Sequence, residues 1–179
     1  MRRLMTVSLV VSVTFGYSAL SARQAAKPPV SVDKAGLAAT VTNNQRQALA
    51  PAAGQTFLWV TATASTAETF DLTKVTLVNG PSSIPLIGVS TWDGDPKAFS
   101  MIAPVHLQAG NTLQQPLEQS SSDGSSALAF TPGKTATLKI SKPPVSFCLL
   151  FAVPQGFRSG QVKGLGATDL PLPALAAGR

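Results

Sequence analysis

The sequence predicts an all-β protein, an antiparallel β-sandwich. Short segments rich in Val, Thr, Leu, Ile and Phe recur along the chain, separated by turn residues such as Asn79-Gly80-Pro81 and Pro132-Gly133. No window carries the apolar stripe of an amphipathic helix. Because helices are not available to connect parallel strands, we expect antiparallel sheets that pack face to face.

An export signal is expected at residues 1–22. Arg2 and Arg3 precede an apolar stretch over 4–15, and small residues follow up to Ala22, which is the order found in secretory signal peptides. The apolar stretch is shorter than the ~20 residues that span a bilayer, which disfavours a retained anchor. We therefore expect a secreted or periplasmic protein with no membrane span after signal removal.

Residues 23–29, RQAAKPP, form the expected tether, and 30–166 the expected sandwich domain. The clearest strand is expected at 56–64, where two sets of side chains alternate between opposite faces and Trp59 is expected in the core. Weaker strands are expected at 37–42, 70–78, 86–92, 105–107, 127–130 and 161–165.

Two strands near the C-terminus differ in pattern. Residues 135–141 alternate apolar with polar side chains, as in a half-buried strand, whereas 147–153 are apolar on both faces, as in a central strand. Cys148 lies in this second run, so we expect a buried, inert thiol. A bridge between two chains is the alternative, and it would require exposure of this segment.

Two segments are expected to be mobile. Residues 111–126, with a QSSSDGSS tract, form the longest polar connection. Residues 167–179 contain two prolines and little periodicity, so we expect a flexible C-terminal tail.

The charge is low and scattered. Charged residues make up 12 % of the chain, and removal of residues 1–22 leaves twelve basic and eight acidic side chains. Lys134, Lys139 and Lys142 form the only basic grouping, which is typical of a solvated strand face. The sequence therefore predicts no nucleic-acid partner.

The residue counts argue against an enzyme. His106 is the only histidine, and the chain has no Gly-x-Ser-x-Gly segment to present a serine nucleophile. Gly133-Lys134-Thr135 lacks the upstream glycine of a phosphate-binding loop, since position 128 is Leu. We expect no catalytic residue and no cofactor.

No metal site is predicted. A blue-copper site needs two histidines, and a looser pairing of Met101 with His106 is a minor alternative. Asp93-Gly94-Asp95 has the alternating carboxylates of a calcium loop, but two acids are few for six to eight oxygen ligands. A plain turn is favoured there.

The order of strand and turn motifs in this chain is similar to that of a known protein family. The chain has a Gly-x-x-Phe-x-x-Val segment at residues 54–60, a Pro-Gly-Lys turn at 132–134 before Leu138, and LLFAVPQGFRSGQVKGL at 149–165. Over about residues 37–166 it resembles the secreted bacterial immunoglobulin-like sandwiches typified by the mycobacterial immunoprotective extracellular antigen. The resemblance implies an immunoglobulin-like β-sandwich that is secreted and non-catalytic, and it supplies no binding residue.

Trp92, Phe99 and Phe157 are the candidate contact patch, because aromatic side chains provide rigid contact area. The predicted function is surface contact with a protein or cell-envelope component. The alternative is a small-ligand or carbohydrate-binding module, with a pocket between the sheets or near Trp92.

Overall fold

The structure is a computed structural model that describes residues 28–91, 96 and 98–175. All named strands pair antiparallel, and the described residues contain one short 3₁₀ turn, η1 (Leu72–Lys74), and no α-helix. The predicted all-β, antiparallel fold is confirmed. The expected signal peptide (1–22) and most of the expected tether (23–29) lie outside the described residues.

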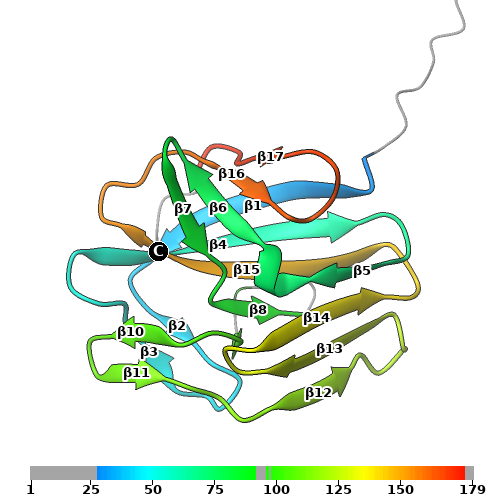
Figure 1. Ribbon diagram of the computed structural model, residues 1–179, viewed down its shortest axis with the longest axis horizontal. Helices are drawn as coiled ribbons and strands as arrows, with labels where there is room; N and C mark the ends of the chain where they lie inside the picture. The colour runs from blue at the N-terminus through cyan, green and yellow to red at the C-terminus, as the bar shows by residue number, and fades with distance from the viewer. Residues whose placement is uncertain (1–27, 92–95, 97, 176–179) are drawn as a thin grey trace, which may run out of the picture.

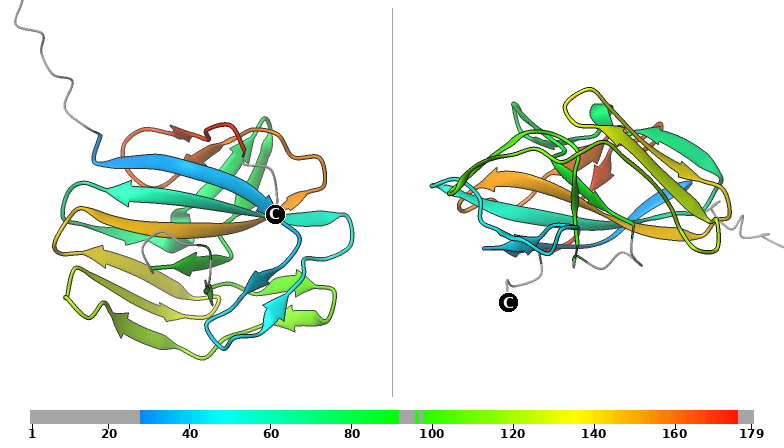
Figure 2. Two further views of the ribbon diagram at one scale, coloured as in Figure 1. Left: turned by 180° about the vertical axis from the view of Figure 1, so that it is seen from behind. Right: turned by 90° about the horizontal axis from the view of Figure 1, so that it is seen from below.

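A five-stranded sheet forms one layer (Figures 1 and 2). The long strands β4 (Gln55–Ala64) and β15 (Val145–Pro154) pair along their whole length at its centre, and this pairing fixes the register of the layer. In spatial order the strands are β1 (Val30–Ala38), β4 (Gln55–Ala64), β15 (Val145–Pro154), β8 (Gly88–Ser90) and β9 (Ser100–Met101).

Two four-stranded sheets lie together against one face of this layer, as the view from below in Figure 2 shows. One has the order β12 (Leu117–Ser120), β13 (Ser126–Thr131), β14 (Thr135–Ile140) and β5 (Glu68–Asp71). The other has the order β17 (Leu170–Pro171), β16 (Gln161–Lys163), β6 (Thr76–Asn79) and β7 (Ser82–Pro85).

The main hydrophobic core lies between these layers. Leu58 and Val60 of β4 and Phe147 and Leu149 of β15 point into it, and the side chains of the facing sheets complete it. The rings of Phe147 and Phe70 lie 6.0 Å apart across the interface, a separation at which aromatic pairs attract. The arrangement is sandwich-like, and alternation along β4 and β14 determines which side chains enter the core.

The opposite face of the five-stranded sheet carries a second, smaller core. Residues of β2 (Val41–Thr42), β3 (Ala48–Leu49) and β10 (Val105–Leu107) cover it, and β11 (Gly110–Thr112) pairs with β10. The five-stranded sheet contributes Phe57 of β4 and Cys148 and Leu150 of β15 to this second core. Both faces of β15 are therefore covered, which explains its continuous apolar sequence.

The predicted burial of Cys148 and the predicted Pro-Gly-Lys turn are confirmed. The Cys148 side chain is buried at 0 % exposure in the second core. Gly133, with φ of 67°, forms the turn between β13 and β14, where the Lys134 amide donates to the Thr131 carbonyl. Trp59 is half-buried and packs against the second core.

The predicted strands at 56–64, 135–141 and 147–153 correspond to β4, β14 and β15. The predicted strand over 70–78 is wrong as one element, because η1 separates β5 from β6. Likewise, the region predicted as one strand over 37–42 holds the end of β1 and the separate strand β2.

The two segments expected to be mobile contain ordered elements. Residues 111–126 include β12, which pairs with β13 over four residues. The expected tail contains β17, which pairs with Gln161 and Val162, and the Leu172 amide donates to the Gly160 carbonyl. Three leucines of this tail pack against the main core, so the domain extends past its predicted end at 166: Leu170, Leu172 and Leu175.

Candidate functional site

The aromatic contact patch predicted from the sequence does not form as expected. Phe99 is 0 % exposed and belongs to the second core, and Phe157 is 4 % exposed and belongs to the main core. The backbone at Phe99 is paired with the end of β2 and the segment after it, since its amide donates to the Thr42 carbonyl and its carbonyl accepts from the Asn44 amide. Trp92 lies outside the described residues.

The other candidate ligand residues do not gather in one place. His106 is exposed on β10, whereas Met101 is 1 % exposed in the second core. Among the described residues, His, Cys, Asp and Glu form no group of three or more that could hold a metal ion. Asp93-Gly94-Asp95 lies outside the part of the chain that the structure describes.

A polar cavity of about 730 Å³ lies where the turn between β12 and β13 meets the start of β15. We call it the serine cavity, and only Pro144 and Val145 of its lining are apolar. The polar lining residues are Thr91, Gln119, Ser120, Ser121, Ser122, Asp123, Ser125, Ser126, Lys142 and Ser146.

Hydrogen bonds within the β12–β13 turn shape one wall of the serine cavity. The Ser126 amide donates to Ser121 Oγ at 2.9 Å, and Ser121 Oγ lies 3.1 Å from Ser125 Oγ. The Asp123 carboxylate accepts from the Ser125 amide at 2.9 Å, an Asx-type turn. The serine-rich tract is therefore held by its own side chains.

The charges in the serine cavity are one acid and one base. The Ser125 amide, followed by the Ser121 and Ser125 hydroxyls, stabilises the Asp123 carboxylate and lowers its pKa to about 2. The Lys142 ammonium donates to the Asp123 main-chain carbonyl at 2.5 Å, which ties the β14–β15 connection to the β12–β13 turn. Two ammonium hydrogens of Lys142 remain for other acceptors.

Ser146 contributes a hydroxyl from β15 and is connected by hydrogen bonds to β4 and, through β4, to β1. Its Oγ lies 2.8 Å from Thr63 Oγ1 on β4, and Thr63 Oγ1 donates to the Asp33 carboxylate on β1 at 2.6 Å. Ser31 donates to the same carboxylate at 3.1 Å. The Ser146 side chain is therefore held by a row of hydrogen bonds across three strands.

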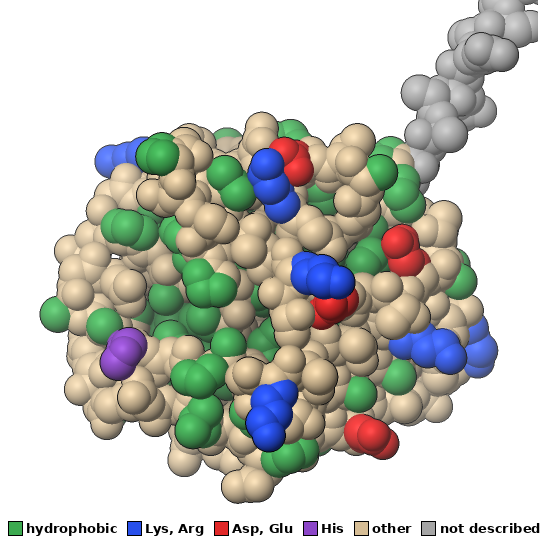
Figure 3. All heavy atoms as spheres, in the orientation of Figure 1, with side chains coloured by type: hydrophobic (Ala, Val, Ile, Leu, Met, Phe, Trp, Pro, Cys, Tyr) green, Lys and Arg blue, Asp and Glu red, His purple; other side chains and the backbone are tan. Residues whose placement is uncertain are grey.

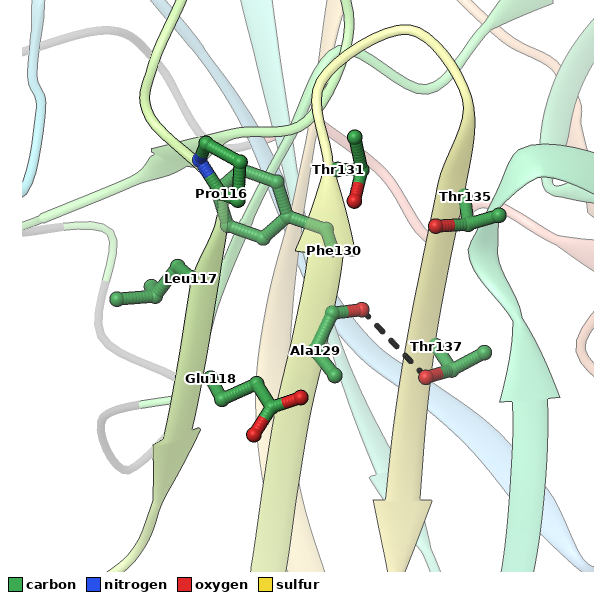
Figure 4. A pocket seen from close by; sticks show the side chains of 8 residues that line it. All are labelled: Pro116, Leu117, Glu118, Ala129, Phe130, Thr131, Thr135 and Thr137. Atoms are coloured by element: carbon green, nitrogen blue, oxygen red, sulfur yellow. Dashed lines mark hydrogen bonds between the residues drawn. The ribbon is translucent and has the colours of Figure 1, made fainter.

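A second cavity of about 390 Å³ lies on β12, β13 and β14. Figure 4 shows Thr137 donating to the Ala129 carbonyl, with Glu118 on the neighbouring strand and Leu117 directed away from β13. Glu118 is the only charged residue of its lining. This cavity is about half as large and presents fewer polar groups than the serine cavity.

The rest of the described surface has few strong features. Figure 3 shows charges of both signs scattered over the face that carries the two four-stranded sheets, with apolar side chains around a hollow in its left half. Among described residues, Leu113 is the one large hydrophobic side chain that is mostly exposed, at 65 %. No helix in the described chain has the length and apolarity that crossing a bilayer requires.

Comparison of the chain with protein-family models, curated proteins and solved structures found no match. Support for the candidate site therefore comes from its geometry alone. The sequence does not predict this cavity, because a serine-rich tract is typical of a mobile loop. The available signal was the Asp123-x-Ser125 spacing, which is typical of an Asx turn.

Proposed function

We propose that this protein is an exported, non-catalytic, immunoglobulin-like binding module that holds a neutral polyhydroxylated ligand, such as a cell-envelope carbohydrate, in the serine cavity. The observation that carries the proposal is the convergence of hydroxyl, amide, carboxylate and ammonium groups from separate segments on one cavity. Its volume of about 730 Å³ is within the range of small-molecule sites.

The donor and acceptor chemistry of the lining favours a sugar. Serine hydroxyls and the Gln119 amide can both donate and accept hydrogen bonds, as the hydroxyls of a carbohydrate can. Asp123 and Lys142 contribute one charge of each sign, so the lining carries no excess charge that would select an anion or a cation. An uncharged ligand with many hydroxyls satisfies both properties.

Surface contact with a protein or envelope component, the function first expected from the sequence, is the second candidate. The apolar side chains around the hollow in Figure 3 favour it. Binding to a protein surface usually depends on a few large side chains that become buried in the interface. In the described chain, Leu113 is the one large apolar side chain that is exposed. The serine cavity therefore has the stronger support, and Trp92 stays a predicted contact residue.

Calorimetry on the chain from residue 23 to 179 tests the proposal. Cellotetraose, maltotetraose and mannotetraose serve as probes. We expect at least one to bind, and Lys142→Gln to weaken that binding about tenfold, the effect of losing a charged hydrogen bond. Lys139→Gln is the matched control, since Lys139 is exposed on β14 and outside the cavity lining. Equal losses in both variants, or no heat with any probe, would overturn the proposal.

A further inference from the structure

We infer that Ser146 is a fixed hydrogen-bond acceptor in the serine cavity, because Asp33 sets the direction of its hydroxyl through Thr63. This inference rests on the proposed function, and it names the chemical group that the ligand must place there. The ligand group that meets Ser146 must be a hydrogen-bond donor, such as a sugar hydroxyl.

The direction of the hydrogen bonds is set at Asp33. An ionised carboxylate has no hydrogen and can only accept. Its Oδ2 accepts from Thr63 Oγ1 at 2.6 Å, and its Oδ1 accepts from Ser31 Oγ at 3.1 Å. The one hydroxyl hydrogen of Thr63 is therefore committed to Asp33.

The direction at Ser146 follows from this commitment. Thr63 Oγ1 and Ser146 Oγ lie 2.8 Å apart, a distance typical of a hydrogen bond between hydroxyls. Because Thr63 has no second hydrogen, Ser146 must donate to Thr63. The Ser146 oxygen then keeps a lone pair, and no hydrogen, for a ligand in the cavity.

The pairing register of three strands holds these hydroxyl groups side by side. Ser31, Thr63 and Ser146 are directly opposite one another on β1, β4 and β15. The register of β1 shifts between Val32 and Lys34, which leaves Asp33 as the additional residue of a β-bulge. A bulge redirects a side chain relative to regular alternation, and here the Asp33 carboxylate contacts Thr63.

The serine cavity therefore has a hydrogen-bond acceptor at one position and a donor at another. Ser146 accepts, while Lys142 on the preceding connection retains two hydrogens to donate. A carboxylate, sulfate or phosphate oxygen placed at Ser146 would face a lone pair and have no hydrogen to share. The cavity should therefore prefer a neutral sugar over a uronic acid of the same length.

Neutron diffraction from deuterated, unliganded crystals tests the hydrogen positions directly. We expect the Thr63 hydroxyl deuterium to point at Asp33 and the Ser146 hydroxyl deuterium to point at Thr63. A Ser146 deuterium directed into the serine cavity would overturn the inference. This result does not depend on sugar binding, so it is distinct from failure of the proposed function.

Thr63→Val and Thr63→Ser test the consequence for selectivity, with maltotetraose and tetragalacturonate as probes. In Thr63→Val the Ser146 hydroxyl is free to turn and donate, so the preference for maltotetraose should fall about fivefold, the effect of about one hydrogen bond. Thr63→Ser keeps the hydroxyl and should keep the preference. Urea unfolding of both variants identifies a loss caused by misfolding, and a preference unchanged in a folded Thr63→Val would contradict the inference.

Discussion

Trp59 lies across Gly36 on the neighbouring strand, and the two residues are directly paired between β4 and β1. A Cβ atom built on Gly36 would overlap the indole ring, with Trp59 Cε2 at 2.7 Å. The absence of a side chain at position 36 therefore allows Trp59 to cover this part of the second face.

Gly36→Ala should destabilise the protein. The added methyl group displaces the Trp59 ring, and overpacking of this kind costs about 1–3 kcal/mol in the free energy of unfolding. Urea denaturation followed by far-UV circular dichroism measures it. The double variant Gly36→Ala with Trp59→Leu should lose less than the two single losses added together, because the clash is gone. Additive losses would show that the ring and the methyl group do not interact.

The Cys148 thiol should be inaccessible in the folded protein. It is 0 % exposed in the second core, where a thiol behaves as a small apolar group. We expect no reaction with a disulfide reagent such as Ellman's reagent in native buffer and one thiol per chain in 8 M urea, a concentration that unfolds most small domains. Rapid labelling without denaturant, or a disulfide-linked dimer on non-reducing gels, would contradict this placement.

The turn that forms the wall of the serine cavity should depend on pH only in strong acid. Because the pKa of Asp123 is lowered to about 2, its contribution to the turn is present above its unfolded value, about 3.9, and is lost as the pH falls through about 2. Carbon-13 NMR of the carboxyl groups measures this titration. Ser121→Ala should raise the midpoint, and an Asp123 midpoint near 4 in the parent protein would contradict the hydrogen-bond network.

Removal of the C-terminal segment should weaken the domain. A chain ending at residue 166 lacks β17 and the leucines that pack against the main core. We expect a loss of about 2 kcal/mol or more in the free energy of unfolding, comparable to burial of one leucine side chain. A chain ending at residue 175, which keeps β17 and these leucines, is the control and should be more stable than the chain ending at 166. Equal stability of both truncated chains would show that β17 contributes nothing.

The strongest parts of the fold were predictable because their side-chain patterns are unambiguous. β14 alternates buried and exposed residues without a break, and β15 is apolar on both faces because two cores enclose it. The start of β1 was missed for a physical reason. The bulge at Asp33 changes the alternation, so Val30 is buried before it and Ala35 after it, and the pattern no longer has a period of two.

The serine cavity was not predicted because strand pairing creates it. β12 is polar, and backbone pairing with β13 orders it without an apolar periodicity that a sequence could reveal. Ser146, Thr63 and Asp33 are far apart in the chain and meet only through the register of three strands. Phe99 and Phe157 were predicted to be exposed, but both rings are buried. Turn residues near an aromatic side chain do not show whether its ring points to solvent or into the core.

Chemical-shift mapping of the nitrogen-15-labelled chain 23–179 with maltotetraose, cellotetraose and mannotetraose tests the central claim most directly. At roughly 10 mM sugar, enough to saturate a site with a millimolar Kd, we expect saturable shifts at Ser121, Ser125, Lys142 and Ser146. Residues of the second cavity, such as Thr137, should not shift. No saturable shifts, or shifts confined to residues outside the serine cavity, would contradict the account.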